Sequence, residues 1–235
     1  SYLNNQEVLS NISFIINPGE SFAIVGPTGS GKTTITNLIT KFYEINTGSI
    51  LIDGKDIDNY SLETVRSKIG IILQDVFLFA DTIFNNITLF NENITLEDVE
   101  NAAKELEIHE FISSLPGGYS FNVSERGTTL SAGQKQLIAF LRVLVNNPDI
   151  LILDEATSSI DSYSEDLIKN ATKKITKDKT SIIIAHRLST IESANRIIYM
   201  ENGKILESGN HKELLNISNG KFKKLYEEQF VDELV

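Results

Sequence analysis

The stretch Gly26-Pro27-Thr28-Gly29-Ser30-Gly31-Lys32-Thr33, followed directly by Thr34, decides the fold of this chain. It fits the phosphate-binding P-loop (Walker A) pattern of a glycine, four residues, a second glycine, a lysine and a hydroxyl residue. In such a loop the glycines let backbone N–H groups point inward at an anion. A glycine-rich turn without a ligand is the alternative interpretation, so the flanking sequence must decide.

The flanks of the loop indicate a strand before it and a helix after it. Phe22 to Val25 is a short apolar run, which is typical of a strand buried on both faces. Apolar residues then recur with the spacing of one helix face, at Ile35, Leu38, Ile39 and Phe42. We therefore expect Lys32 to reach the terminal phosphates of a nucleotide and the Thr33 hydroxyl to help hold Mg²⁺.

Composition excludes several classes of function. A chain of 235 residues with 41% hydrophobic content is large enough for one α/β domain with an inserted subdomain. The absence of cysteine excludes disulfides, thiolate metal sites and a cysteine nucleophile. A formal net charge of −11 argues against a broad grip on nucleic acid. No apolar run is long enough for a membrane span, and we expect the chain as given to be soluble.

The remaining apolar runs predict a mostly parallel sheet. Alternating apolar residues predict a strand over Val8–Ile16, and Gly48–Ile52 predicts a second strand before an Asp53-Gly54 turn. Three further runs predict buried strands, at Ile69–Leu73, Ile150–Leu153 and Ser181–Ala185. Near the end of the chain, the Asn202-Gly203 turn between apolar segments predicts a hairpin. A polar amphipathic helix is expected from Lys212 onward.

Polar residues follow the buried strands at Gln74, Asp154, Glu155 and His186. The carboxyl ends of parallel strands share one edge of a sheet, so we expect these residues and Gly26 to converge on one site. Asp154 needs a cation partner there, for which Mg²⁺ bound to nucleotide phosphates is suited. A helix cap or solvated turn is the alternative for the two acids, and a satisfied core position is the alternative for His186. His109 and His211 have no such context and are expected at the surface.

Between about Thr82 and Asn147 the pattern changes to helical periods. Thr95 with Asp98 is placed to cap one helix. The sequence therefore predicts a helical subdomain over about 82–147, set into an α/β core of about 1–81 and 148–235. All of this makes one domain over residues 1–235.

The segment Leu130-Ser131-Ala132-Gly133-Gln134 has two interpretations. Structurally, Ser131 and Gln134 match the Ser-x-x-Gln capping box of the following helix. Functionally, a serine-capped helix start that contains glycine is also an anion site. The two interpretations are compatible.

In order and spacing, these motifs resemble the nucleotide-binding domain of ATP-binding cassette (ABC) transporters. The resemblance rests on the phosphate loop, Gln74, Leu130–Gln134, Ile150–Glu155, Ser158–Asp161 and His186, and it covers essentially the whole chain. Ser124–Gly127, just before Leu130, is similar to a loop of the exporter branch. The implied fold is a P-loop NTPase core with a mostly parallel sheet, an N-terminal antiparallel β subdomain and an inserted α-helical subdomain.

The resemblance implies roles for individual residues. Tyr2 would stack on adenine, and residues Gly26–Thr34 would bind the nucleotide. Thr33, Gln74 and Asp154 would hold Mg²⁺, with Gln74 linking the metal to a membrane domain. The implied catalytic residues are Glu155 as general base for water, His186 at the γ-phosphate, and Gln74. Leu130, Ser131, Ala132, Gly133 and Gln134 would complete the ATP site of a second copy, and Asp161 would couple the two sites.

The resemblance also implies the setting of the domain. Two identical or homologous nucleotide-binding domains would pair head to tail around two ATP molecules and power export. Transmembrane domains expected upstream would hold the pair at the cytoplasmic face of a membrane, and no nucleic acid partner is expected. Two alternatives stay open: a soluble ABC-family ATPase in DNA repair or translation, and a P-loop kinase acting on a small molecule.

Overall fold

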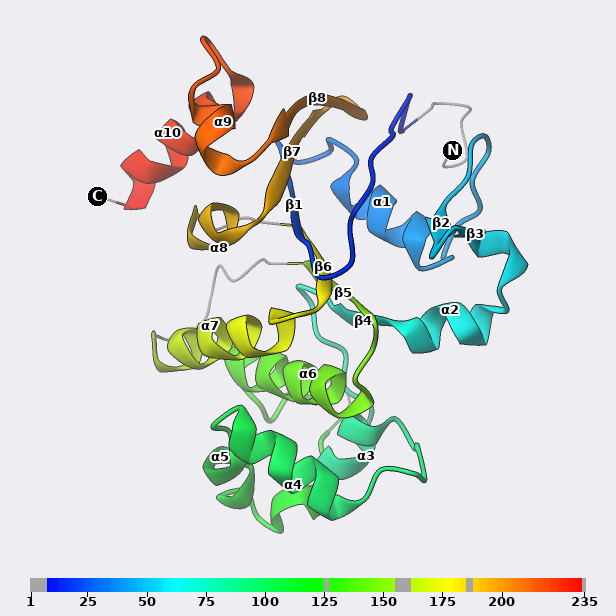
Figure 1. The fold of residues 1–235 in the computed structure, drawn as a ribbon. Helices are drawn as coiled ribbons and strands as arrows, with labels where there is room; N and C mark the ends of the chain where they lie inside the picture. The colour runs from blue at the N-terminus through cyan, green and yellow to red at the C-terminus, as the bar shows by residue number, and fades with distance from the viewer. Residues whose placement is uncertain (1–7, 125–126, 155–161, 185–187, 234–235) are drawn as a thin grey trace. The chain divides into compact units, whose positions relative to one another are not determined.

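The computed structural model describes residues 8–124, 127–154, 162–184 and 188–233. The predictions for Tyr2, Glu155, Asp161 and His186 fall outside the described residues. The chain forms two compact units (Figure 1). Unit 1 consists of Ser1–Ile69, Asp149–Glu155 and Asp178–Val235, and unit 2 consists of Gly70–Pro148 and Ala156–Lys177.

A six-stranded sheet with the order β4-β5-β6-β1-β7-β8 organises the α/β part. Its strands are β4 (Ile69–Ile72), β5 (Ile150–Asp154), β6 (Thr180–Ile184), β1 (Ser21–Val25), β7 (Arg196–Glu201) and β8 (Lys204–Gly209). β1 pairs in parallel with both β6 and β7, and β5 pairs in parallel with β6. β7 and β8 form the predicted hairpin, which is antiparallel. The buried strands were thus predicted to within about a residue.

The other elements of unit 1 are mostly short. A two-stranded antiparallel sheet joins β2 (Leu51–Ile52) to β3 (Lys55–Asp56), so the predicted antiparallel part is confirmed only as a short pair. The helices are α1 (Lys32–Ile39), η1 (Ile57–Asn59), α2 (Leu62–Lys68), α8 (Leu188–Ser193), α9 (His211–Leu215) and α10 (Lys221–Glu233).

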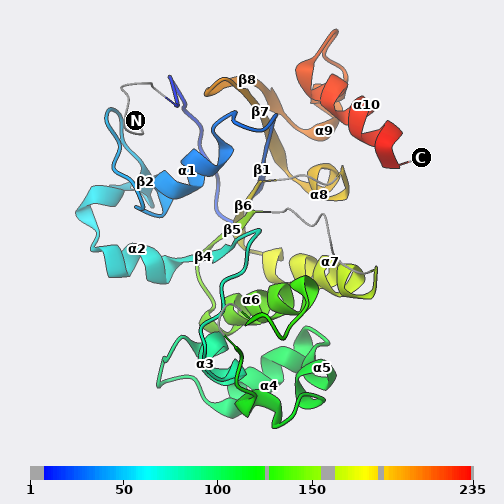
Figure 2. The same cartoon turned by 180° about the vertical axis from the view of Figure 1, so that it is seen from behind.

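Unit 2 is helical apart from the end of β4. It contains α3 (Ile83–Thr88), α4 (Leu96–Glu105), α5 (His109–Ser113), η2 (Gly118–Ser120), α6 (Ala132–Asn146) and α7 (Ser162–Thr176). Helix α6 packs against α7, α3 and α4 (Figure 2). Its packed face is fully buried at Ile138 and Leu141, which have no exposed surface. No described helix is long and apolar enough to cross a membrane.

The predicted strand over Val8–Ile16 is wrong. The segment forms no strand, although Ile12, Phe14 and Ile16 are half-buried and the residues between them are exposed. Asn11 interrupts the extended chain with a φ of 52°. Side chains hold the segment instead, because the Phe14 ring stacks on Phe22 with a centroid separation of 5.0 Å. The alternating pattern correctly indicated that one face of the segment is partly buried. It did not indicate whether a neighbouring strand would pair with the backbone.

Two helix predictions also need correction. The helix after the phosphate loop ends at Ile39, and Phe42 lies beyond it with 56% of its surface exposed and with the Arg66 guanidinium over its ring. The single helix expected from Lys212 is divided into α9 and α10. The reason for the second start is Glu207, whose carboxylate accepts hydrogen bonds from the Lys221 and Phe222 backbone N–H groups at the beginning of α10.

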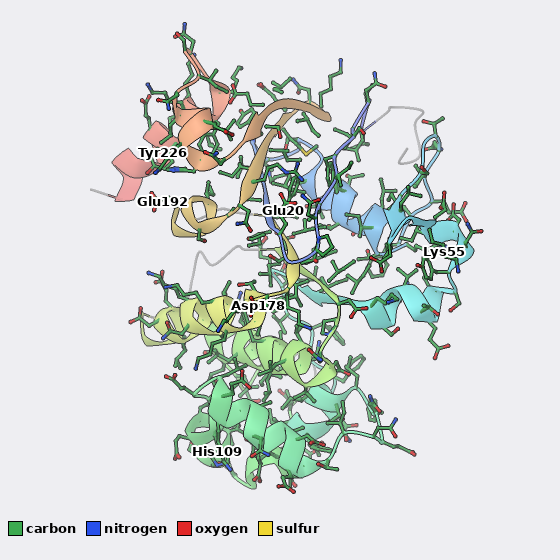
Figure 3. The ribbon with its side chains drawn as sticks, in the orientation of Figure 1. Glu20, Lys55, His109, Asp178, Glu192 and Tyr226 are labelled. Atoms are coloured by element: carbon green, nitrogen blue, oxygen red, sulfur yellow. The ribbon has the colours of Figure 1, made fainter. Side chains whose placement is uncertain are left out.

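Neither of the two histidines expected at the surface is fully exposed. His109 Nδ1 lies 2.9 Å from the Tyr119 hydroxyl, so that ring is held within unit 2. In unit 1, His211 packs its ring against Tyr226, which donates its hydroxyl to Glu192 (Figure 3). Both rings are half-buried, and aromatic neighbours that are distant in sequence caused the error.

The cap of α4 generates a pH-dependent prediction. Hydrogen bonds from the Thr95 hydroxyl (2.6 Å) and the Thr95 N–H (2.8 Å) lower the pKa of Asp98. A lowered folded-state pKa gives stability that is present above the unfolded pKa of about 3.9 and is lost as the pH falls. We therefore expect Asp98→Asn to lower the thermal midpoint at pH 7, with the difference shrinking as the pH falls toward about 3.

Circular dichroism melts over that pH range would measure this effect. Glu97→Gln is the matched control, because Glu97 lies in the same first turn and is not part of the capping box. A deficit of Asp98→Asn that stayed constant down to pH 3 would contradict an ionic origin.

Candidate functional site

The phosphate loop lies between β1 and α1, as the flanking sequence predicted. Phe22, Ala23, Ile24 and Val25 have no exposed surface, so β1 is buried on both faces, and its backbone pairs with β6 and β7 in the sheet. The strand ends at Val25 and the helix begins at Lys32, so residues 26–31 form the whole connection. Three glycines in it adopt positive φ, with values of 147°, 80° and 104° at Gly26, Gly29 and Gly31.

Gly26 is required for packing behind the loop as well as for its conformation. A Cβ built on Gly26 would lie 2.0 Å from the Met200 carbonyl oxygen of β7. Gly29 differs, because a Cβ there would meet nothing within 4 Å, and its role is the positive φ alone. The contribution of Met200 was missed at the sequence level, since no local signal relates position 26 to position 200.

Lys32 is the buried cation of the site. Only 6% of its surface is exposed, and its Nζ donates hydrogen bonds to the carbonyl oxygens of Gly26 (2.7 Å) and Pro27 (3.0 Å). Burial lowers the pKa of Lys32, and the negative charge of Asp154 opposes that shift. An anion bound in the loop would act in the same direction as Asp154, by favouring the charged form.

Ser30 supplies an independent sign that the loop fits a polar ligand. Its residue is 2% exposed, yet its Oγ is buried without a hydrogen-bond partner. Leaving a buried hydroxyl unpaired costs about 1–3 kcal/mol. A phosphate oxygen in the loop would accept a hydrogen bond from such a hydroxyl, so the residues present suit a phosphate group.

The residues also suit a Mg²⁺ ion that is held mainly by phosphates. Asp154 ends β5, two strands from β1 in the sheet order, and its charge acts on Lys32. Thr33 is exposed at the start of α1, with a hydroxyl for which no hydrogen bond to another described residue is found. Among the described residues no group of three or more His, Asp or Glu side chains could hold a metal by itself. One carboxylate and one hydroxyl match the few protein ligands that Mg²⁺ keeps beside a nucleotide.

The start of α6 confirms the capping interpretation of Leu130–Gln134. The Ser131 hydroxyl accepts from the Gln134 N–H at 3.2 Å, and the Gln134 side chain accepts from the Ser131 N–H at 3.0 Å. Leu130 and Gly133 are buried, whereas Ser131 and Ala132 are exposed. The anion-binding interpretation of the same residues stays a prediction.

Two of the other predictions, Gln74 and the Leu130–Gln134 segment, belong to unit 2. Gln74 is exposed and lies two residues beyond the end of β4, within unit 2. Within unit 1, the structure brings together Lys32, Ser30, Gly26 and Asp154. The exposed residues Pro27 and Thr28 and the half-buried Thr34 complete the loop and its entry into α1.

Comparisons with known proteins agree on one family. A family model described as ABC transporter matches residues 9–158. A putative multidrug export ATP-binding/permease protein, YgaD of Bacillus subtilis (strain 168), is 46% identical over 223 residues, which cover 95% of this chain and 38% of that protein. An ATP-dependent lipid A-core flippase of Methylobacillus flagellatus is 47% identical, with coverage of 94% of this chain and 38% of that protein.

A solved structure has the same fold. It is described as a bacterial Atm1-family ABC exporter with ATP bound, and it matches with a TM-score of 0.89 and 41% sequence identity. The match covers 97% of this chain and 40% of that one. The chain thus spans about two fifths of the length of the relatives that it matches. The predicted α/β P-loop fold with a mostly parallel sheet is confirmed.

The buried ammonium of Lys32 generates a prediction about phosphate binding. Lys32→Met removes a charge-assisted hydrogen-bond donor, so we expect ATP affinity to fall roughly 10- to 100-fold. The rise in thermal midpoint that ATP and Mg²⁺ give should fall with it. Lys41→Met is the control, because Lys41 pairs with Asp58 at 3.2 Å in the same unit. An equal thermal shift for the two variants would contradict the role given to Lys32.

Proposed function

The chain belongs to the ABC transporter family, and from this premise we propose that it binds and hydrolyses ATP as the nucleotide-binding domain of an exporter. The observation that carries the proposal is the phosphate loop. It contains a buried lysine and a buried hydroxyl without a hydrogen-bond partner, and both groups can donate hydrogen bonds to a phosphate. The names of the similar proteins, which refer to export and to a flippase, support the exporter setting.

The proposed chemistry depends on positioned charges. Phosphoryl transfer asks mainly for orientation and electrostatic stabilisation, because the protein need not form a covalent bond. Lys32 and the loop N–H groups bind the phosphates, while Thr33, Asp154 and Gln74 hold Mg²⁺. The bound cation would supply neutralisation of charge on the phosphate oxygens. Tyr2 is proposed to stack on adenine.

The remaining roles follow the sequence-level expectations. Glu155 is proposed as the base that activates water, because it follows Asp154 at the end of a buried strand. His186 is proposed at the γ-phosphate and Asp161 in coupling of two sites. Residues Leu130–Gln134 are proposed to complete the ATP site of a second domain, identical or homologous, paired head to tail. Each domain would then contribute its phosphate loop to one ATP site and its Leu130–Gln134 segment to the other.

We also propose the domain division and the location. A helical subdomain of about 82–147 would be set into a core of about 1–81 and 148–235. Attached transmembrane domains would hold the pair at the cytoplasmic face of a membrane. The family match to residues 9–158 lends no support to a small-molecule kinase. The similar export proteins favour transport over DNA repair or translation.

Unit 2 offers a surface for a membrane domain, formed by two exposed segments beside Asn86. Phe77 and Phe79 are 54% and 46% exposed and contact edge to face, while Leu89 and Phe90 are 45% and 59% exposed after α3. The buried Asn86 amide accepts from the Phe79 N–H at 2.8 Å and donates to the Phe79 carbonyl at 3.0 Å. These contacts fix the Phe77–Phe79 segment to α3, which ends beside Leu89 and Phe90.

Rigidity of that surface is increased by Arg142. Its guanidinium donates to the Asn86 carbonyl at 2.8 Å and to the Phe77 carbonyl at 3.4 Å. Burial lowers the pKa of Arg142, but a guanidinium keeps its charge in proteins. A rigid, apolar surface of this kind suits an apolar helix end from an attached membrane domain.

Hydrolysis and pairing can be tested together through Glu155. Phosphate release by Glu155→Gln should be about 10²- to 10⁴-fold slower than by the wild type, because a general base contributes that much. Light scattering should show the variant as a monomer that becomes a dimer only with ATP. Glu97→Gln should hydrolyse ATP at the wild-type rate. Native-rate hydrolysis by Glu155→Gln would remove Glu155 from the mechanism.

A second variant tests whether two domains pair through the start of α6. In the Glu155→Gln background, Ser131→Arg should retain ATP binding and lose the dimer, because the bulky cation occupies the space of the partner's phosphates. A kinase would be indifferent to the change at Ser131. A dimer that persisted in the double variant would contradict the head-to-tail arrangement.

The absence of cysteine gives a direct test of the apolar surface. Phe90→Cys should react readily with a maleimide in the isolated domain and more slowly in the full-length protein, freed of other cysteines. Leu96→Cys is the matched control, because Leu96 is 48% exposed in the same unit. Equal rates for Phe90→Cys in the two proteins would contradict docking at this surface.

A further inference from the structure

Three segments that are distant in sequence contact one another at the phosphate loop. They are the loop itself at Ser30 and Gly31, the N-terminal segment Val8–Ser10, and the β7–β8 turn at Asn202-Gly203. All three belong to unit 1. The turn lies beside the start of the described N-terminal segment (Figure 1). The N-terminal segment and the β7–β8 turn belong to none of the motifs on which the proposed function rests.

Gly203 is bonded to both of the other segments through its backbone. Its N–H donates to the Ser30 carbonyl at 3.1 Å, and its carbonyl accepts from the Ser10 N–H at 2.9 Å. Each backbone group of this one residue therefore holds a different segment. The turn itself has positive φ at both positions, 51° at Asn202 and 72° at Gly203, as an Asn-Gly hairpin requires.

No other residue type fits at position 203 without movement. A Cβ built there would lie 2.0 Å from the Val8 carbonyl oxygen and 2.9 Å from the Val8 carbonyl carbon. These atoms are backbone, so no side chain can rotate to relieve the contact. Gly31 is packed in a similar way, since its Cβ would lie 2.6 Å from Leu9 Cδ2 and 3.8 Å from Gly203 Cα.

We propose that Gly203 is a positioning residue for nucleotide binding, because its backbone ties the phosphate loop to the N-terminal segment Val8–Ser10. The inference rests on the proposed function. Ser30 carries the unpaired buried hydroxyl of the loop, so the Gly203 N–H holds in place a residue of the phosphate-binding motif.

The two ties act on affinity through preorganisation. A loop held in its binding conformation before the ligand arrives loses less freedom on binding. Displacement of Val8 by a side chain at position 203 would move the N-terminal segment and release Ser30 from the turn. The phosphates of the nucleotide would then meet a less ordered loop. Residues that act after binding, such as Glu155, are not touched by Gly203.

The test compares Gly203→Ala with Gly19→Ala. The two glycines have nearly the same φ, 72° and 73°, but a Cβ on Gly19 would meet nothing within 4 Å. The control therefore carries the same backbone strain without the collision. We expect Gly203→Ala to raise the Kd for ATP about tenfold and Gly19→Ala to change it less than about twofold. At saturating ATP, kcat of both variants should stay within about threefold of the wild type.

Each outcome of the titration has a distinct meaning. Equal Kd values for the two variants would overturn the positioning role of Gly203. A fall in kcat at unchanged KM would overturn it as well, since that result points to general damage. A wild-type protein that fails to bind ATP would overturn the proposed function, and this inference with it.

Hydrogen exchange on the wild type gives a second test that needs no variant. Bound ATP should slow exchange of the Gly203 and Ser10 amides about tenfold, because both bonds stiffen with the loop. The Gly220 amide, which donates to the Ile217 carbonyl at 3.1 Å in the same unit, is the control and should not change. ATP binding without protection at Gly203 and Ser10 would overturn the proposal even if Gly203→Ala failed to fold.

Discussion

The burial of the Lys32 ammonium group at the start of α1 is the constraint on which this structure depends. Removing an ammonium group from water costs several kcal/mol even after relaxation of the protein. Two loop carbonyls and the charge of Asp154 offset part of that cost for Lys32. A bound anion would offset more of that cost, because it favours the charged form. The glycines of the loop, the buried strand before it and the supporting hairpin hold Lys32 where an anion can reach it.

The strand order of the parallel sheet explains how the Asp154 carboxylate comes close enough to act on Lys32. Asp154 pairs in register with Ile184 of β6, and Ile184 pairs with Ile24 of β1. Carboxyl ends of parallel strands lie at one edge, so a residue that ends β5 falls beside the residues that follow β1. The hairpin on the other side of β1 supplies backbone contacts rather than charge. The charge of Asp154 and the backbone contacts of the hairpin thus reach the loop from opposite sides of β1 in the sheet.

The sequence predicted what local physics determines. Buried strands, the capping boxes of α4 and α6 and the Asn-Gly turn were found because each is encoded within a few residues. The Val8–Ile16 strand was predicted wrongly, because alternating apolar residues indicate a buried face but not whether another strand pairs with the segment. At the site, Lys32 and Asp154 were identified from their motifs. The supports from Met200 and Gly203 were not, because contacts between positions so far apart leave no local pattern.

The start of α6 shows that a structural and a functional role need not compete for one side chain. A serine hydroxyl has two acceptor lone pairs and one donor hydrogen. The Ser131 oxygen accepts from the Gln134 N–H, which satisfies the helix cap. Its own hydrogen is left for another acceptor, and the residue is exposed. A cap of this kind orients the hydroxyl at the positive end of a helix of 15 residues, where an anionic oxygen is the favoured acceptor. The cap is therefore compatible with the anion-binding role proposed for Ser131.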